Sequence, residues 1–174
     1  SNKIRESVSI NPGTSGGGGI TEVGNECLFM LGSHVGHDCK LGNKIILANN
    51  AALAGHVILG NGVHVGGLSG IHQFVRIGEG AFIGALSMVN KDVIPFGMVY
   101  GERARLMGLN LVGLRRKGFK AAIIRDFKKA YAGLFSEKGT LKARLNVMDP
   151  KSNPLINKLV TFISEDSDRS LLSP

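Results

Sequence analysis

The sequence predicts a parallel β-helix built from six-residue repeats, followed by a small α-helical domain. Three observations lead to this prediction. Aliphatic residues recur at every sixth position through most of the first half of the chain. The chain contains 25 glycines, whereas aromatic residues make up only 6% of it, which favours tight repeated bends over an aromatic core. Beyond residue 96 the apolar spacing changes to that of helices.

The six-residue repeat predicts a triangular prism. Its anchor positions are all apolar and comprise Val23, Phe29, Val35, Leu41, Leu47, Leu53, Leu59, Val65, Ile71, Ile77, Ile83 and Val89. A small or β-branched residue stands two positions before most anchors, and glycine often follows directly. Each repeat would form one strand-like side with its anchor pointing inward, and three repeats would close one coil of about 18 residues. Successive coils would then stack about 4.8 Å apart.

Residues 11–22 are predicted to protrude from the prism as a loop beside the site. Ile4 and Ile10 keep the six-residue spacing but are one residue out of phase with Val23, and a glycine run lies between the two phases. No Lys-Ser/Thr pair follows these glycines, so we do not interpret the loop as a nucleotide-binding P-loop. Cys27 and Cys39 fall at small-residue positions of the repeat and are predicted to be buried free thiols, as in a reducing cytoplasm.

The predicted domains are residues 1–96 for the prism and residues 97–174 for the helical part. Apolar spacing and breaker residues predict helices over Arg105–Lys117, over Phe119–Leu134 and around Pro154–Ile163, and a frayed tail over Glu165–Pro174. Gly118 is expected to end the first of these helices.

The net charge of +8 comes entirely from the second half of the chain. Residues 1–96 carry six basic and six acidic side chains, whereas residues 97–174 carry fifteen and seven. Seven basic residues and one acidic residue lie between Arg115 and Lys129, which predicts either a docking face for an acidic partner or a solvated helix face. No nucleic-acid-binding motif accompanies the charge, and no apolar run reaches the ~20 residues of a membrane span. We therefore expect neither nucleic acid binding nor membrane insertion.

All five histidines lie in the predicted prism. His37, His56 and His72 are separated by intervals close to one coil, which predicts a strip along one edge, with His34 on the level of His37. His64 lies off this strip and is interpreted as structural. Imidazole serves both acid–base catalysis and zinc binding, so the strip leaves both possibilities open.

Four stretches closely resemble the UDP-N-acetylglucosamine O-acyltransferase family: Leu31–Cys39, Ile46–His56, Gly70–Phe74 and Asn110–Phe119. The resemblance runs from about Lys3 to about Tyr131 in one register. It implies a left-handed parallel β-helix and a homotrimer with its sites between subunits. It also implies further coils before residue 1 that carry an Asp and a Lys contacting the sugar. The chain is then expected to be a fragment or a natural short form of a cytoplasmic enzyme.

The same resemblance implies a reaction and its residues. The family moves a 3-hydroxyacyl group from the phosphopantetheine of acyl carrier protein to the 3-hydroxyl of UDP-N-acetylglucosamine, the first step of lipid A biosynthesis, without a further cofactor or metal. His37 would be the general base, Asp38 its orienting partner and the Gly55 N–H the oxyanion donor. The positions that match substrate-binding residues are His34, His56, His72, Gln73, Asn110, Arg116 and Lys117, and Ala85 matches a position that limits acyl-chain length.

Three alternatives remain open on the sequence. One is a related sugar-nucleotide N-acyltransferase, because no code for the acceptor is visible. Another is a γ-type carbonic anhydrase, whose zinc is held by three histidines across a trimer interface, although its ligand spacing is not matched. The third is an inactive scaffold that lacks the front coils.

Overall fold

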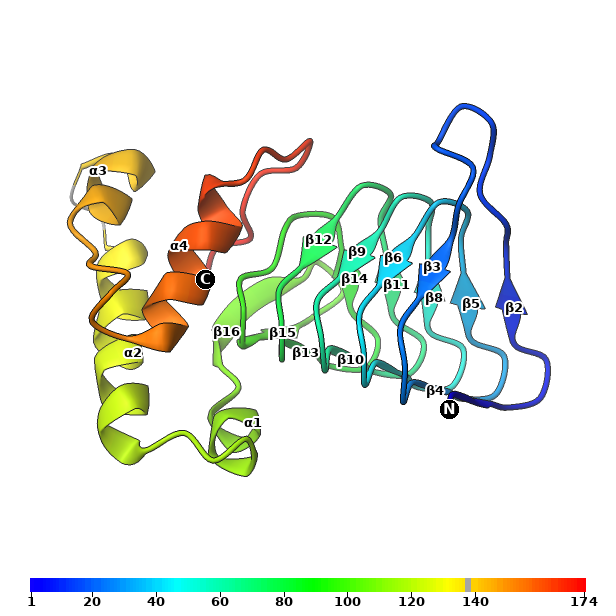
Figure 1. The fold of residues 1–174 in the computed structure, drawn as a ribbon, viewed down its shortest axis with the longest axis horizontal. Coiled ribbons are helices and arrows are strands. Elements are labelled where there is room, and N and C mark those ends of the chain that lie inside the picture. Colours follow the sequence, from blue (N-terminus) through cyan, green and yellow to red (C-terminus); the bar gives the residue numbers. More distant parts are fainter. Residues whose placement is uncertain (137–138) are drawn as a thin grey trace.

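The computed structural model describes residues 1–136 and 139–174 and shows a three-sided parallel β-solenoid with helices packed at one end (Figure 1). Sheet A contains β1 (Lys3–Ile4), β4 (Leu28–Phe29), β7 (Ile46–Leu47), β10 (His64–Val65), β13 (Phe82–Ile83), β15 (Gly97–Tyr100) and β16 (Arg105–Leu109). Sheet B contains β2 (Ser9–Ile10), β5 (His34–Val35), β8 (Ala52–Leu53), β11 (Gly70–Ile71) and β14 (Met88–Val89). Sheet C contains β3 (Glu22–Val23), β6 (Lys40–Leu41), β9 (Ile58–Leu59) and β12 (Arg76–Ile77).

The repeat predicted from the sequence sets the register of all three sheets. Residues 18 apart are paired from coil to coil, as in Leu28 with Ile46 and His34 with Ala52. The anchors from Phe29 to Val89 are all buried and form one continuous aliphatic core. In the first coil the inward-pointing Ile4 and Ile10 are 58% and 39% exposed.

The loop over residues 11–22 explains the phase change seen in the sequence. Ser9 pairs with His34, 25 residues later, whereas all later pairings in sheet B join residues 18 apart. The first coil is therefore seven residues longer than the 18-residue coils that follow it, and the surplus protrudes as the loop drawn in dark blue in Figure 1.

The corners of the prism need one residue each with left-handed backbone torsion angles. We call the turn between sheets B and C the BC corner (residues 36–39, 54–57 and 72–75) and the turn between sheets C and A the CA corner (residues 24–27, 42–45, 60–63 and 78–81). The BC corner has Asp38, His56 and Phe74 at φ near +60°. Lys44 and Asn50 adopt the same φ at other corners, so this conformation belongs to the fold and not to one site.

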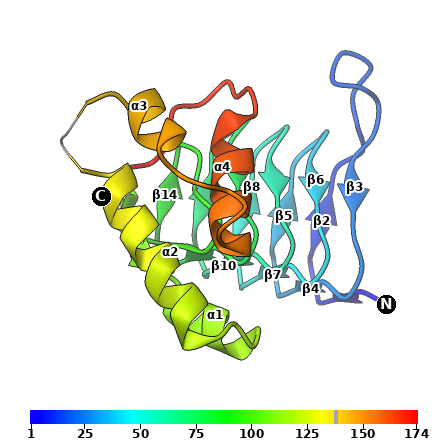
Figure 2. The same ribbon diagram turned by 60° about the vertical axis from the view of Figure 1, so that its left-hand side comes forward.

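The helical domain packs against the last coil through one aromatic cluster. It consists of α1 (Leu111–Arg116), α2 (Ala121–Leu134), α3 (Leu141–Asn146) and α4 (Pro154–Ser164). Phe96, which ends the last coil, makes edge-on contacts with Phe119 and Phe127. α4 packs against α2, and Figure 1 and Figure 2 show α4 on the side nearer the prism. No helix in the described part of the chain is long and apolar enough to cross a membrane.

The predicted helix over Arg105–Lys117 is wrong in its first half. Arg105–Leu109 forms β16, which pairs antiparallel with β15, and only Leu111–Arg116 is helical. Leu106 and Leu109 are both buried although they are three residues apart, because the register shifts between them and leaves the exposed Met107 as an extra residue. The repeat also continues past the predicted end, because β15 pairs parallel with β13.

The prediction of a frayed tail over Glu165–Pro174 is also wrong. After α4 the chain runs out along the prism and turns back, as the red segment in Figure 1 shows. Backbone hydrogen bonds join Asp92 to Ser170 and Leu172, and Leu172 is buried. The helix α3, which was not predicted, lies between α2 and α4 in the sequence. The helix expected around Pro154–Ile163 is confirmed as α4, with Asn153 capping its N-terminus.

Candidate functional site

The predicted histidine strip lies at the BC corner, although its members do not occupy equivalent positions. Residues 18 apart are equivalent, so His37 stands above Gly55 and Gln73, whereas Asp38 stands above His56 and Phe74. His56 stacks on Phe74, with ring centroids 4.5 Å apart, and meets His37 edge-on at 5.1 Å. His64 lies on sheet A, away from this corner, as predicted.

His37 and Asp38 form a hydrogen-bonded pair. His37 Nδ1 lies 2.7 Å from Asp38 Oδ2. Neighbouring residues of a strand point to opposite faces, so this contact depends on the left-handed turn at Asp38. The imidazole of His37 is 43% exposed, whereas the carboxylate of Asp38 is 1% exposed. The pair therefore presents one accessible ring held from behind by a buried carboxylate.

The protruding loop completes the surroundings of Asp38. The hydroxyl and the backbone N–H of Thr14 donate to the two carboxylate oxygens, at 2.7 Å and 2.9 Å, and the hydroxyl of Thr21 accepts from the Asp38 N–H. Burial raises the pKa of Asp38, but the hydrogen bonds from His37 and Thr14 and the nearby His56 outweigh it and lower the pKa to about 2. Asp38 is therefore ionised at neutral pH.

The protonation of Asp38 decides which nitrogen of His37 is free. An ionised carboxylate only accepts hydrogen bonds, so the Nδ1 of His37 carries the proton that it shares with Asp38. In the neutral ring the lone pair is then on Nε2. This nitrogen can take a proton from a bound hydroxyl group, as the histidine of a Ser-His-Asp triad does.

Gly55 lies directly beneath the ring of His37. A methyl group at this position would lie 2.5 Å from Cε1 and 2.6 Å from Nε2 of His37, closer than atoms can approach. Any side chain at residue 55 would therefore displace the histidine. The Gly55 N–H finds no acceptor among residues 1–136 and 139–174. It is thus available as a hydrogen-bond donor close to the basic nitrogen.

A groove runs over sheet B next to this pair. It forms a cavity of about 420 Å³ whose lining residues include His34, His37, Gly55, His72 and Met88. His34 Nδ1 is 2.7 Å from the hydroxyl of Ser9. Two neighbouring outward-facing positions of sheet B in the middle of the groove are small, with alanine at 52 and glycine at 70, and the larger His34 and Met88 flank them.

A metal ion is a chemical alternative for the same corner. His37, Asp38 and His56 hold donor atoms within 4.8 Å of one another. However, Asp38 Oδ2 already lies at hydrogen-bond distance from both His37 Nδ1 and the Thr14 hydroxyl. His56 Nε2 is 3.8 Å from the same oxygen. This arrangement is that of a proton-transfer pair, and metal analysis of the purified protein distinguishes the two.

The residues predicted to hold the nucleotide lie at the CA corner instead. Asn110 caps α1, accepts from the Gly113 N–H and donates to the Gly80 carbonyl. The Nζ of Lys117 is 2.7 Å from Glu79 and lies over the ring of Phe96. Arg116 is exposed at the end of α1. Within one chain the fold therefore does not bring these residues to His37.

Several residues around the two corners were not predicted. Glu79 binds both Lys117 and Lys158; burial raises its pKa, and the two lysines outweigh this and lower it. Thr14 and Arg169 reach the BC corner from the loop and the tail. The six-residue repeat has no signal for such contacts, because each involves a residue outside the repeat.

Other predicted features have clear positions. Ala85 is exposed at the corner between sheets A and B, so its role in acyl-chain length stays a prediction. Cys27 and Cys39 are buried free thiols, as predicted.

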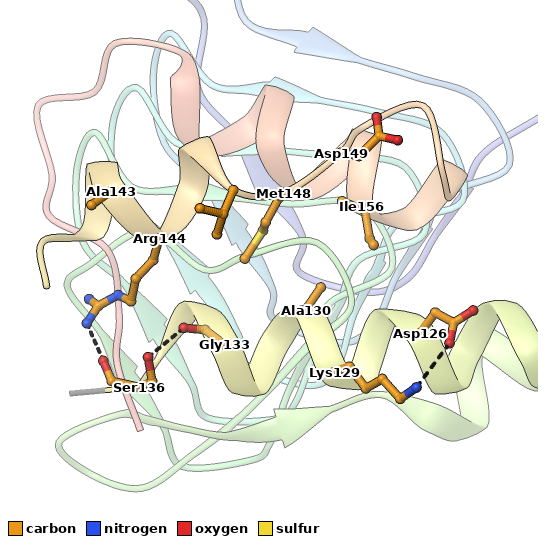
Figure 3. Close-up of a pocket in the computed structure, with 11 residues that line it drawn as sticks. Asp126, Lys129, Ala130, Gly133, Ser136, Ala143, Arg144, Met148, Asp149 and Ile156 are labelled. Atoms are coloured by element: carbon orange, nitrogen blue, oxygen red, sulfur yellow. Dashed lines mark hydrogen bonds and ion pairs between the residues drawn. The ribbon is translucent and has the colours of Figure 1, made fainter. Parts of the chain in front are cut away.

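A cavity of about 610 Å³ lies among α2, α3 and α4, away from the histidines (Figure 3). Its lining in the described part of the chain includes Lys129, Met148 and Ile156 but no histidine or cysteine, so we do not place the chemistry there.

Comparisons with known proteins agree with these features. A sequence model of the family described as Udp N-acetylglucosamine O-acyltransferase, Domain 2, matches residues 92–172. The chain is 52% identical over 173 residues to an acyl-[acyl-carrier-protein]–UDP-N-acetylglucosamine O-acyltransferase of Paracoccus denitrificans, covering 99% of this chain and 66% of the relative. The corresponding protein of Agrobacterium fabrum is 45% identical, with coverage of 98% and 64%.

A solved structure shows the same relationship. The UDP-N-acetylglucosamine acyltransferase from Campylobacter jejuni superimposes with a TM-score of 0.91 at 41% identity, covering 99% of this chain and 68% of that one. The chain thus spans just under two thirds of the length of the curated relatives that it matches.

Proposed function

This chain belongs to the UDP-N-acetylglucosamine O-acyltransferase family, and we propose that it transfers a 3-hydroxyacyl group from acyl carrier protein to the 3-hydroxyl of UDP-N-acetylglucosamine. The observation that supports this most directly is the His37–Asp38 pair above Gly55. It places a basic nitrogen and a free N–H donor beside a largely apolar groove of about 420 Å³. The reaction would begin lipid A biosynthesis in the cytoplasm.

The first step of the proposed mechanism is attack on the thioester. His37 Nε2 takes the proton of the sugar 3-hydroxyl while the oxygen bonds to the thioester carbonyl carbon. Asp38 stabilises the imidazolium that forms, because it is ionised and hydrogen-bonded to Nδ1. The carbonyl oxygen becomes an oxyanion, which accepts a hydrogen bond from the Gly55 N–H.

The second step is the collapse of this tetrahedral intermediate. The carbon–sulfur bond breaks, the carbonyl re-forms as an ester, and the phosphopantetheine sulfur leaves. The proton on His37 Nε2 passes to that sulfur, so the base returns to its starting state and the carrier leaves as a free thiol. No further cofactor is needed, because the acyl group arrives activated.

We propose that the active unit is a homotrimer. The base lies at the BC corner, whereas Asn110, Arg116 and Lys117 lie at the CA corner with the helical domain. A site that uses both the base and the CA-corner residues needs the CA-corner residues of a neighbouring chain. A closed cyclic assembly supplies it once per subunit.

The basic residues of α1 and α2 fit an acidic carrier protein. The lining of one hollow on this face combines the apolar Phe119 and Ile124 with four basic residues, Arg115, Arg125, Lys128 and Lys129.

A charge reversal tests this docking face. We expect Lys128→Glu to raise KM for the carrier-bound donor, with the effect shrinking at high salt because exposed charges are screened. Transfer from an acyl-pantetheine lacking the carrier should be unchanged. A Lys142→Glu variant on α3 serves as the charge-matched control, and an equal rise in KM there would contradict a specific docking face.

The experiment that tests the function is acyl transfer from 3-hydroxyacyl carrier protein to UDP-N-acetylglucosamine. The parent chain should turn over, His37→Ala should not, and His64→Ala should keep the parent rate because His64 lies on sheet A. Circular dichroism of both variants verifies that they remain folded. Equal rates in the parent and His37→Ala would overturn the proposed mechanism. Zinc bound in one-to-one ratio, with hydration of carbon dioxide, would support the carbonic anhydrase alternative.

A further inference from the structure

The tail after α4 brings one arginine to the BC corner. Arg169 Nη2 lies 2.8 Å from His72 Nδ1, and Arg169 Nε lies 3.0 Å from the carbonyl oxygen of Gln73. The two contacts together hold the guanidinium against both residues. His72 lines the groove over sheet B, so the contact joins the tail to the candidate site.

The chemistry of the guanidinium fixes the direction of this hydrogen bond. Arginine stays protonated in proteins and only donates, so His72 Nδ1 must be the acceptor. His72 is then neutral and carries its proton on Nε2. A competing contact exists, because His72 Nδ1 also lies 3.4 Å from the Gln73 carbonyl and could donate to it if Arg169 were absent. Arg169 therefore selects between the two tautomers of His72.

The tail is fastened closely enough to hold Arg169 in place. The Ser167 hydroxyl donates to Asp92 Oδ2 at 2.6 Å and accepts from the Arg169 N–H at 3.1 Å. Backbone hydrogen bonds from Asp92 to Ser170 and from Leu172 to Asp92 fix the chain on the far side. The side chain of Arg169 thus projects from a segment that is anchored both before and after it.

We propose that Arg169 is a positioning residue that holds His72 as its Nε2–H tautomer, so that this N–H is a donor to the substrate in the groove. The proposal rests on the proposed function and on the position of His72 in the lining of the groove, where the family resemblance implies a substrate-binding residue. A donor aligned in advance needs no reorganisation when the substrate binds. In a mixture of tautomers, part of the His72 population has an acceptor at Nε2 in place of the N–H donor.

Activity measurements test the consequence for the reaction. We expect Arg169→Ala to lower kcat/KM about tenfold, in the range found when a supporting group no longer aligns a binding side chain. Arg169→Lys should recover only part of this loss, because one ammonium group cannot reproduce the two-pronged contact. Arg5→Ala is the matched control and should keep the parent rate, since Arg5 is 60% exposed and its side chain pairs with the adjacent Glu6, its one partner among the described residues.

Nitrogen-15 NMR of the histidine rings tests the positioning itself and needs no turnover. His72→Gln assigns the signals of His72. In spectra recorded at a pH where the His72 ring is neutral, the parent should show only the Nε2–H form. Arg169→Ala should show a substantial Nδ1–H population under the same conditions. Identical His72 spectra in both proteins would overturn the proposal, whatever the rates. Absence of transfer in the parent together with the expected tautomer change would count against the proposed function and leave the contact standing.

Discussion

The pairing of His37 with Asp38 shows how the corner makes chemistry possible. Consecutive side chains of a strand diverge, and only the turn at Asp38, with φ +59°, brings the carboxylate back to the ring. A left-handed residue costs on the order of 1 kcal/mol, which the stacked coils absorb at every corner. The site therefore uses a conformation that the fold already requires. Its special features are the side chains placed there, together with a glycine beneath the ring.

Gly55→Ala tests the close approach of His37. The added methyl group would lie 2.5 Å from the ring, so the imidazole must move away from Asp38 or out of the groove. We expect transfer activity to fall at least a hundredfold, as for misplaced catalytic groups in general, with the coil register unchanged. Gly133→Ala on α2 is the matched control, because a methyl group there meets no atom within 4 Å. Full activity of Gly55→Ala would show that His37 is not held over this glycine in the working enzyme.

Asp38→Asn tests the electrostatics of the pair through the pH dependence of stability. The pKa of Asp38 falls from 3.8 to about 2 on folding, so its ionised form stabilises the native state above about pH 4. This stabilisation is lost as the pH falls through about 2. The difference in unfolding free energy between parent and variant should thus be constant above about pH 5 and shrink toward pH 2. Denaturant titrations at several pH values measure it, and a difference independent of pH would contradict the assignment.

At the scale of elements, the tail behaves as an extra strand segment fastened to the prism. Arg76 projects from β12 and joins three parts of the chain. Its guanidinium contacts the Asp92 carboxylate at 2.8 Å, Glu165 at 3.1 Å and the Phe162 carbonyl at 3.1 Å. Its side chain is 11% exposed and that of Asp92 is 2% exposed. This buried pair holds both the end of α4 and the segment that carries Arg169.

Arg76→Ala should destabilise the fold and release the tail. Removing one partner leaves the buried Asp92 carboxylate without its cation, which typically costs about 3 kcal/mol or more. We expect a lower thermal midpoint and faster amide exchange over residues 165–173, while exchange in the middle coils stays slow. Arg103→Ala, an exposed arginine, is the control and should change neither quantity. Slow exchange of the tail in Arg76→Ala would show that other contacts hold it.

At the scale of the whole molecule, the two corners divide the proposed site between chains. The prism is rigid, because its anchors from Phe29 to Val89 are stacked in one core. The BC and CA corners of one chain therefore cannot approach each other by bending. The helical domain stays with the CA corner, since Glu79 there binds both Lys117 of α1's C-terminal cap and Lys158 of α4.

Mixing two inactive variants tests this division. His37→Ala and Arg116→Ala chains should each be inactive or weak alone. Random co-assembly of equal amounts should regain roughly a quarter of the parent activity, because about one site in four then has both residues intact. Light scattering should give a mass about three times 18.4 kDa. Failure to regain activity in mixed trimers of verified composition would place both residues in the site of one chain.

The sequence by itself determined the prism, the coil length and the corner that holds the histidines. A six-residue repeat is a local rule, and stacking turns it directly into register, so Phe29 to Val89 could be assigned without a structure. The spacing did not decide the handedness of the coil, which came from resemblance alone.

The tertiary structure decided everything that joins the repeat to segments outside it. The β16 strand depends on pairing with β15, and the tail depends on Arg76 and Asp92, so neither was visible in the spacing of apolar residues. The contacts of Thr14 with Asp38 and of Arg169 with His72 span 24 and 97 residues. Long-range polar contacts of this kind leave no periodic trace, because each is made once, between two particular side chains that only the folded chain brings together.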